Sequence, residues 1–440
     1  MFVKKFFKGG AKVPHFKNTA NSETIKMPPQ KKVTIPMLQH IGAPCEPLVK
    51  RGDIVKVGQI IGDSDSFISA PIHSSVSGTV TGISSILHPG GFYIKTVDIE
   101  SDGKQEICEG IGPPKYSNTE EFTQLIRKSG LVGLGGAGFP ASVKLSPPKG
   151  KKIDTLIINA AECEPFITSD YREIIENLDY IMDGINLVCG ALDIENVIVG
   201  IEDNKPEAIE NMMNATSGRK GIKIAKLKSR YPQGAEKMLI YAVTKRKVPA
   251  GRLPSDVGVI VMNVNSISFI SKYMKTGIPL IEKRVTVDGA VVKNPSNVRV
   301  LIGTPLGRVF DFCGGFYDSP KKVLMGGPMM GIAQFSLDLP VVKHTNALLA
   351  FGEKDAVIPE SGACIRCGRC VTACPMNLMP LYLNNNAIKA DIEGLQKYHI
   401  NDCMECGSCS YVCPAKINLV QSIRLGKLRV KQAAPVKGGK

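Results

Sequence analysis

The feature that most constrains this chain is a cysteine motif that occurs twice, Cys-x-x-Cys-x-x-Cys-x-x-x-Cys-Pro. Three thiolates separated by pairs of residues can converge from one turn of the chain on a single iron–sulfur cluster. The fourth cysteine is redirected by the proline that follows it, so it ligates the cluster of the other run. We therefore predict two [4Fe-4S] clusters. The first would be held by Cys364, Cys367, Cys370 and Cys413, and the second by Cys374, Cys403, Cys406 and Cys409.

Two other uses of these cysteines fit the spacing less well. Tandem Cys-x-x-Cys pairs can bind structural zinc, but four zinc ligands do not require the repeated motif with its proline. Disulfides do not fit an odd number of cysteines, 13, in a chain whose first residues lack the apolar segment of a secretion signal. We expect a reducing cytoplasmic setting, in which free thiolates can accept iron.

Length and charge narrow the remaining possibilities. A chain of 440 residues should form several domains, and no apolar run is long enough to span a membrane. The net charge of +15 is concentrated in residues 1–32 and 421–440. These segments can be solvated basic tails, or they can attract an anionic membrane surface or an acidic protein. The absence of tryptophan and of any nucleic-acid motif disfavours binding to nucleic acid.

Residues 33–99 predict an all-β module, because short apolar segments alternate with Gly, Pro, Ser and Asp turns. The strings 49–62 and 70–80 resemble the two halves of a biotinyl/lipoyl-type barrel-sandwich domain. Carrier domains of that type attach their cofactor to a lysine at the hairpin tip between those halves. Residues 63–69, at the equivalent place here, contain no lysine. We therefore expect no covalent cofactor and interpret the module as a docking or scaffold domain.

Residues 153–262 alternate apolar strands with helices, which predicts a parallel sheet covered on both faces. The expected strands are 153–159, 196–201, 222–227 and 257–262, and the expected helices are 171–190, 205–215 and 234–245. In such sheets, ligands bind outside the carboxyl ends of the strands. The first strand ends at Asn159 and is followed by Glu162 and Glu164, so an amide and two carboxylates are expected at a ligand site.

A glycine-rich run, Gly133-Leu-Gly-Gly-Ala-Gly-Phe-Pro, precedes this sheet. It formally contains Gly-x-Gly-x-x-Gly, but no strand leads into it, so we reject a Rossmann dinucleotide fingerprint. What remains is backbone without side-chain bulk, which can lie close to a flat or phosphorylated ligand.

The order of the glycine-rich run, the Asn-x-x-Glu-Cys-Glu-Pro segment and the doubled cysteine motif resembles the C subunit of the Rnf-type membrane electron-transport complex, over nearly the whole chain. The central part is also similar to the flavin- and NADH-binding subunit of respiratory complex I. The resemblance implies a multidomain α/β fold. Its parts would be an N-terminal arm (1–32), a β barrel-sandwich hybrid (33–118), a Rossmann-like FMN/NADH domain (119–276), a β-grasp, SLBB-like domain (277–340), a helical two-cluster ferredoxin domain (341–425) and a basic tail (426–440).

The resemblance also implies a function, that of a peripheral electron-transfer subunit of a membrane-bound, ion-translocating ferredoxin:NAD+ oxidoreductase, a translocase. Such a subunit exchanges hydride between NAD(H) and non-covalent FMN, and passes single electrons through two [4Fe-4S] clusters to or from membrane subunits. The implied partners are those subunits, NADH and NAD+, and ferredoxin indirectly through the complex. The implied location is the cytoplasmic side of the cell membrane, at its periphery.

By similarity, thirteen residues should line the FMN and NADH site. They are Gly133, Gly135, Gly136, Gly138, Phe139, Lys144, Asn159, Glu162, Glu164, Tyr231, Gly234, Glu236 and Asn263. Glu162 and Glu164 are the expected catalytic carboxylates, at the isoalloxazine or the nicotinamide edge. The sequence departs from the complex I pattern at Leu134, Ala161 and Ala235, where that family has charged residues. These departures affect the NADH contacts and retain the FMN cradle.

Two other functions remain open at this point. A corrinoid (cobalamin) reductase with flavin and iron–sulfur clusters has a similar domain order, and it would accompany a soluble cobalamin enzyme rather than a membrane. A non-enzymatic iron–sulfur scaffold would dock partners through its β modules, and it would contain iron and sulfide but no FMN.

Overall fold

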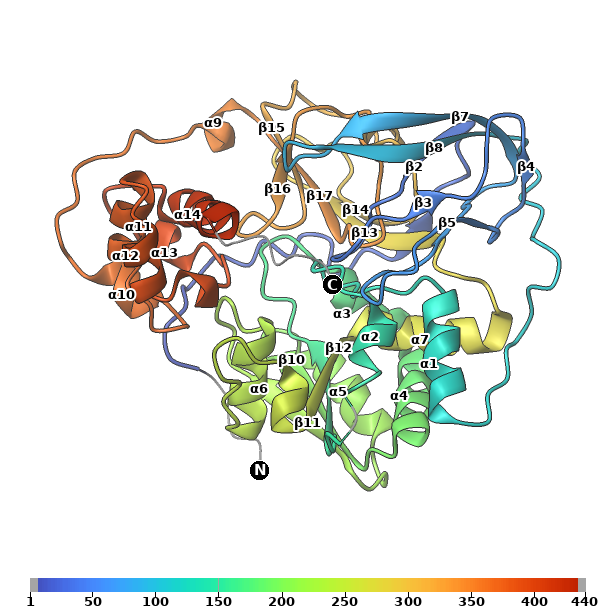
Figure 1. Ribbon diagram of the computed structural model, residues 1–440, viewed down its shortest axis with the longest axis horizontal. Helices are drawn as coiled ribbons and strands as arrows, with labels where there is room; N and C mark the ends of the chain where they lie inside the picture. Colours follow the sequence, from blue (N-terminus) through green and yellow to red (C-terminus); the bar gives the residue numbers. More distant parts are fainter. Residues whose placement is uncertain (1–6, 149, 434–440) are drawn as a thin grey trace.

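A computed structural model describes residues 7–148 and 150–433, which form four packed parts (Figure 1). The β-rich part nearest the N-terminus and the six-stranded sheet lie along the top of the view, the α/β part lies below them, and the helical part lies at the left. This arrangement confirms the predicted multidomain α/β fold. Among the described residues, no helix has the length and apolar character needed to cross a bilayer.

The barrel-sandwich part consists of two small antiparallel sheets. One has the strand order β2 (Lys32–Pro36), β8 (Tyr93–Ser101), β7 (Gly78–Leu87) and β4 (Ile54–Val55), and the other has β3 (Glu46–Pro47), β5 (Ile60–Asp63) and β6 (Ile72–His73). Side chains alternate between inward and outward over residues 33–35 of β2 and 97–99 of β8, as the period of two requires. Val33, Ile35, Val97 and Ile99 accordingly form a core that is inaccessible to solvent.

The α/β part is built on a parallel sheet. Its strand order is β11 (Ile222–Leu227), β10 (Asn196–Glu202), β9 (Thr155–Ala160) and β12 (Val259–Asn263). Leu156 and Ile158 of β9 pack in a core with helices on one face, whereas Ile157 packs on the other face in a core with α6 (Glu236–Thr244). Because β9 and β12 run parallel in register, Asn159 lies opposite Asn263 at their carboxyl ends. Two predicted site residues are therefore neighbours.

The helices of this part differ from the prediction over residues 171–190 and 264–276, and the short helix α2 was not predicted. The other helices here are α1 (Thr119–Lys128), α2 (Ala141–Lys144), α3 (Ser169–Glu176), α4 (Leu178–Leu192), α5 (Pro206–Ala215) and α7 (Val264–Thr276). The single helix expected at 171–190 is wrong, because Asn177 has a non-helical backbone (φ −135°, ψ 35°) and separates α3 from α4. Helix α7 was not predicted; its first turn is capped by the side chain of Asn263.

The β-grasp part contains a six-stranded sheet that extends beyond the predicted range 277–340. Its strand order is β1 (Thr24–Lys26), β14 (Ser296–Leu301), β13 (Glu282–Asp288), β17 (Ala347–Phe351), β15 (Lys322–Met325) and β16 (Ile332–Gln334), with α8 (Leu306–Phe312) after β14. Strand β1 comes from the N-terminal arm, and β17 is a fully buried run that follows residue 340. Segments remote in sequence therefore complete this sheet.

The cluster part is helical. It contains α10 (Arg369–Ala373), α11 (Pro380–Ile388), α12 (Ile392–Lys397), α13 (Ser408–Tyr411) and α14 (Leu419–Ala433), and a short helix α9 (Glu353–Ala356) precedes it. Helix α14 packs on α11, where a Cβ at Gly426 would lie 3.1 Å from Ala387 Cβ. The segment expected to be a basic tail from residue 426 is therefore helical through Ala433, and residues 434–440 lie outside the described residues.

The described part of the N-terminal arm is packed against other parts rather than extended into solvent. Ala11 pairs with Tyr231 through two backbone hydrogen bonds, of 2.8 and 3.1 Å. Gly10 N donates to Ala373 O of the cluster part at 2.8 Å. The arm thus joins the α/β part to the cluster part, and residues 1–6 lie outside the described residues.

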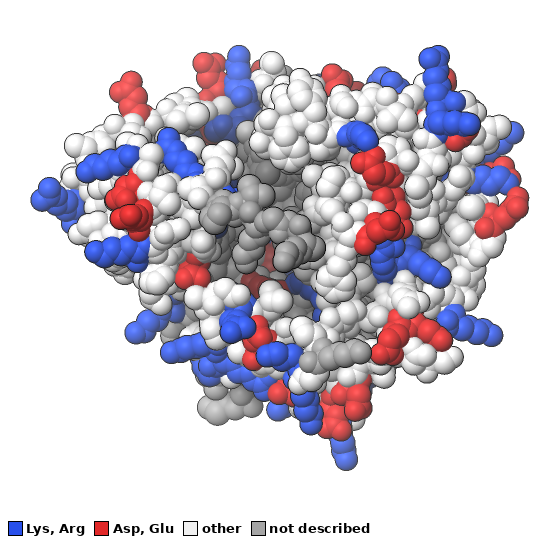
Figure 2. All heavy atoms as spheres, viewed as in Figure 1, with Lys and Arg blue, Asp and Glu red and all other residues white. Residues whose placement is uncertain are grey.

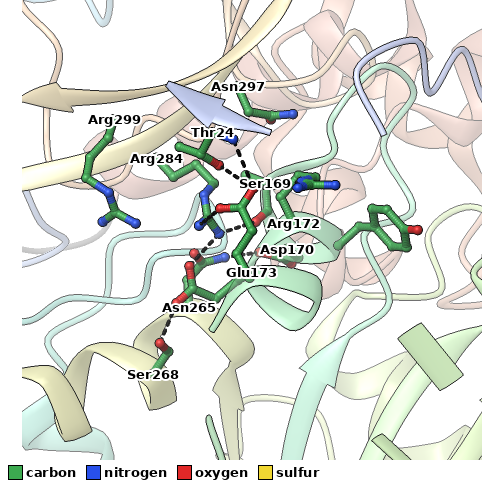
Figure 3. Close-up of polar contacts among 12 residues, drawn as sticks. Thr24, Ser169, Asp170, Arg172, Glu173, Asn265, Ser268, Arg284, Asn297 and Arg299 are labelled. Atoms are coloured by element: carbon green, nitrogen blue, oxygen red, sulfur yellow. Dashed lines mark hydrogen bonds and ion pairs between the residues drawn. The ribbon is translucent and has the colours of Figure 1, made fainter. Parts of the chain in front are cut away.

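A buried ion network joins the β-grasp sheet to the α/β part (Figure 3). Arg284 of β13 donates to Glu173 and, at 2.6 Å, to Glu176, both of helix α3. Glu173 also accepts from Lys272 at 2.9 Å and from Ser268. Burial alone would raise the pKa of Glu173, but Arg284, Lys272 and Ser268 outweigh burial and lower that pKa to about 2. The side chains of Arg284 and Glu173 are 1% and 3% exposed, so neither charge has water as an alternative partner.

Replacing Arg284 with Met should lower the free energy of unfolding by about 3–5 kcal/mol, because Glu173 would remain as a buried charge without its main partner. Calorimetric unfolding would measure the change. The matched control is Arg308→Met, which removes an exposed arginine 3.7 Å from Asp311 and should change stability by less than about 1 kcal/mol. Equal effects of the two substitutions would contradict a dominant role for the buried pair.

The same network predicts that the free energy of unfolding depends on pH. The folded-state pKa of Glu173 lies below its usual value of 4.5, so its stabilising contribution is present above that pH and is lost as the pH falls toward about 2. By pH 4 the loss should reach about 1 kcal/mol relative to pH 7. Glu173→Gln, which cannot titrate, should lack this component of the pH dependence.

Candidate functional site

One cavity of about 1240 Å³ lies at the carboxyl ends of the parallel sheet and is lined by all four parts of the chain. Twelve of the thirteen predicted cofactor residues line it, namely Gly133, Gly135, Gly136, Phe139, Lys144, Asn159, Glu162, Glu164, Tyr231, Gly234, Glu236 and Asn263. The other, Gly138, lies directly behind the wall; a Cβ added to it would be 3.3 Å from His344, which does line the cavity. In Figure 2, basic and acidic side chains are interspersed around the middle of the face in this view.

The glycine-rich run forms a closed loop between α1 and α2. Gly133 N donates to Phe139 O at 2.8 Å, and Gly138 N donates to Gly133 O at 3.2 Å. The loop bends through Gly136 at φ +113°, a conformation that side chains disfavour. Among the described residues, a Cβ added to Gly136 would come within 4 Å of one atom, Asn346 Nδ2, at 3.5 Å. The bare backbone therefore faces open cavity, and this fits the close approach of a flat ring such as the isoalloxazine of FMN.

The segment after β9 presents two carboxylates at the cavity, and both are already hydrogen-bonded by backbone N–H groups. Glu162 accepts from Asp170 N at 2.6 Å and from Tyr171 N at 3.3 Å, so it caps the start of α3. Glu164 accepts from Met329 N and Met330 N, each at 3.0 Å, in the β-grasp part. Burial raises the pKa of each carboxyl to about 7, against the lowering effect of these hydrogen bonds and of nearby Lys17.

Lys17 is a site residue that the sequence analysis did not identify. Its ammonium donates to three carbonyls of the segment after β9, Glu162 O at 2.9 Å, Glu164 O at 2.8 Å and Ile167 O at 2.5 Å. Burial lowers the pKa of Lys17 to about 8, although Glu162 opposes the shift. Nothing local in the sequence distinguishes Lys17 from the other seven lysines of residues 1–32.

Other predicted residues form ion pairs or hydrogen bonds at the cavity wall. Lys144 Nζ lies 2.6 Å from Glu236 Oε1, and Asn159 Nδ2 donates to Gly234 O at 2.8 Å. Asn263 Nδ2 donates to Asp170 Oδ2 at 2.9 Å. These contacts fix the loops that surround the cavity, so a ligand would meet a preformed wall.

Tyr231 connects the cavity to the cluster part. Its ring is buried, and its hydroxyl donates to Cys406 O at 2.7 Å. Cys403 and Met404 of the same cysteine run line the cavity itself. One wall of the candidate flavin site therefore belongs to the run that was predicted to ligate the second cluster.

The structure groups the cysteines across the two runs. Burial raises the pKa of Cys409 to about 12, and neighbouring Cys406, Cys403 and Cys374 add to the rise. Burial likewise raises the pKa of Cys370, with Cys413 and Cys364 adding to it. The fourth cysteine of each run thus lies beside the first cysteines of the other. Buried thiols of this kind need a nearby cation to ionise, which fits iron ligation.

The described residues contain no three His, Cys, Asp or Glu side chains grouped tightly enough to hold a single metal ion. The two sets also differ in exposure: Cys364 and Cys367 are exposed, whereas Cys406 and Cys409 are buried.

Comparison with known proteins identifies four family matches along the chain. Residues 5–104 match the RnfC barrel sandwich hybrid domain, residues 126–272 the Nuo51 FMN-binding domain, residues 284–333 the SLBB domain and residues 363–417 the 4Fe-4S dicluster domain. These matches agree with the predicted cofactors, FMN and two [4Fe-4S] clusters, and with the geometry of the glycine-rich loop and the grouped thiols.

Three curated proteins are similar over most of their length. The chain is 47% identical to the C subunit of the proton-translocating ferredoxin:NAD(+) oxidoreductase complex of Clostridium ljungdahlii, covering 96% of this chain and 93% of that protein. It is 41% identical to the Na(+)-translocating counterpart of Acetobacterium woodii (96% and 97% covered). It is 40% identical to the C subunit of the ion-translocating oxidoreductase complex of Rhodobacter capsulatus (95% and 82% covered).

Cys374→Ala should damage the cluster of the other run, because Cys374 lies with Cys403, Cys406 and Cys409. Paramagnetic resonance of the reduced protein, with iron counted per chain, should show that signal lost and the Cys364 signal retained. Cys108→Ala, outside both runs, is the control and should keep both signals. Loss confined to the cluster of Cys364 would contradict the exchange of fourth ligands.

Proposed function

The chain belongs to the C-subunit family of Rnf-type, ion-translocating ferredoxin:NAD+ oxidoreductase complexes, and we propose that it exchanges hydride with NAD(H) in the described cavity. It is an electron-transfer subunit with an FMN-binding domain and a two-cluster domain. When bound, FMN supplies the conversion between a two-electron hydride and single electrons. The chain's own residues would hold the nicotinamide and flavin rings in contact, exclude water and provide the route by which electrons leave the flavin.

The observation that carries this proposal is the shared wall of the cavity. The glycine-rich loop lines one side, and Cys403 with Met404 lines another. A ring bound against the glycines would therefore lie close to a ligand of the second cluster, without a further carrier between them. Tyr231 supports this arrangement, because its hydrogen bond to Cys406 O holds the cysteine run against the α/β part.

The carboxylates take positioning roles in this proposal. Glu164 lines the cavity and holds the backbone of Met329 and Met330, so it links the nicotinamide edge to the β-grasp part. Glu162 holds the start of α3. Hydride transfer requires no general acid or base, which agrees with two carboxylates whose oxygens are already occupied by N–H donors.

The partners proposed for the chain are the other subunits of the complex, NADH and NAD+, and ferredoxin through the complex. The exposed thiols Cys364 and Cys367 support an exit for electrons at the surface of the cluster part. We place the protein at the cytoplasmic side of the membrane, attached through its partners. Direct attraction of its basic ends to anionic lipid would add to this attachment.

The family matches disfavour both other functions considered. The relatives are named as oxidoreductase subunits rather than corrinoid reductases. A pure scaffold would have no use for a cavity whose wall is bare glycine backbone.

Gly136→Ala should release FMN while both clusters stay bound. The added methyl group enters the cavity where the ring would lie, and φ +113° strains any side chain there. FMN and iron per chain measure the result. Gly52→Ala is a matched control, because Gly52 also has a positive φ of +93°, but a Cβ there meets no described residue within 4 Å. Full retention of FMN in Gly136→Ala would place the flavin elsewhere.

Glu164→Gln should retain FMN and weaken the use of NADH by about tenfold, the effect of losing one hydrogen bond to a charged group. The glutamine oxygen can accept from one of the two N–H groups, but its NH₂ group faces the other. Steady-state kinetics with NADH, compared with reduction of the clusters by an artificial one-electron donor, would separate the steps. Unchanged NADH kinetics would remove Glu164 from the site.

A further inference from the structure

The hairpin tip between β5 and β6 lies at the mouth of the candidate flavin cavity. In carrier domains the hairpin tip bears the modified lysine, whereas here residues 63–69 contain no lysine and include Phe67. The Phe67 side chain belongs to the cavity lining and is nevertheless 74% exposed. A large aromatic ring left exposed at the rim of a cavity is a surface that a flat ligand can cover.

The tip is anchored at both ends, so the ring of Phe67 is presented by a fixed backbone. Arg127 of α1 donates to both carboxylate oxygens of Asp63, at 2.7 and 3.1 Å, and to Ser64 O at 2.8 Å. At the other end, His40 Nε2 lies 3.2 Å from Ser69 Oγ. Gly42 permits the close approach of the neighbouring loop, because a Cβ there would overlap the carbonyl oxygen of Ile68.

The same loop ties the tip to the glycine-rich wall. Ile41 N donates to Gly138 O at 3.0 Å, and Ala43 N donates to Ile68 O at 3.1 Å. Phe67 is therefore separated from the glycine-rich loop by only one intervening loop. Side chains of the barrel-sandwich part continue the rim beside it, namely Ile41, Ile86, His88 and Pro89.

We propose that Phe67 is the stacking platform for the adenine ring of the dinucleotide substrate. The proposal rests on the function proposed above. The nicotinamide ring must reach the flavin, which lies against bare glycine backbone inside the cavity. The second ring of the dinucleotide does not react, and the pyrophosphate linker leaves it nearer the opening. An exchangeable ligand also explains why the aromatic surface remains uncovered in the chain alone.

The test separates the two halves of the dinucleotide with probes that each carry one ring. ADP-ribose contains the adenine ring without nicotinamide. Nicotinamide mononucleotide contains the nicotinamide ring without adenine. Calorimetric titration of the holoprotein should show that Phe67→Ala weakens ADP-ribose binding by about 5- to 150-fold, the range expected for one stacked base. Binding of nicotinamide mononucleotide and the content of FMN should not change. Phe67→Tyr should restore ADP-ribose binding.

Tyr93→Ala is the matched control. Tyr93 is equally exposed, at 73%, and belongs to the same part of the chain, but it is not among the cavity-lining residues. Its loss should leave both titrations unchanged. If wild-type protein binds ADP-ribose and Phe67→Ala binds it equally well, the inference is overturned.

Two further outcomes are distinguishable. Equal weakening of both probes, or loss of FMN, would show that Phe67 acts on the flavin or on the fold, and would overturn the assignment to adenine. If the wild-type protein binds neither probe, the proposed NAD(H) function fails, and this inference fails with it.

Discussion

The buried contact between Arg284 and Glu173 fixes helix α3, on which the ligand cavity depends. Helix α3 has only eight residues, and its buried positions include Asp170, Arg172 and Glu173, which an isolated helix would leave in water. Each polar group on α3 that is buried must therefore be matched by a partner from another part of the chain. For Glu173, the partners are Arg284 of the β-grasp sheet and Lys272 and Ser268 of α7.

Helix α3, fixed in this way, in turn positions residues of the cavity wall. Glu162 caps the N-terminus of α3, while Asp170 in its first turn accepts from Asn263 and Asn265. The segment after β9 is thus held from one side by α3 and from the other by Lys17, whose ammonium gathers three carbonyls. The cavity is shaped by polar contacts that cross domain boundaries, and its glycine-rich side is bare backbone.

The sequence predicts the parts of this site that local spacing controls. The cysteine runs and the glycine-rich run are short motifs, and the apolar periodicity of residues 153–262 predicts the sheet that places Asn159 and Asn263 side by side. The sequence does not predict Lys17, because its three partners lie some 145 to 150 residues away. Strand β1 escapes prediction for the same reason, since it pairs with β14 far along the chain. The break between α3 and α4 also depends on tertiary contacts, because both helices carry continuous helix-compatible residues.

The unequal exposure of the two cysteine sets indicates the spatial order of the two proposed clusters. Cys403 lines the flavin cavity and its neighbours Cys406 and Cys409 are buried, so the proposed second cluster is the inner one. Cys364 and Cys367 are exposed, so the proposed first cluster would be the outer one. If each run lends its fourth cysteine to the other set, as proposed, neither cluster could shift without moving the ligands of its neighbour. The exchange would thus couple the two clusters between the cavity and the surface of the cluster part.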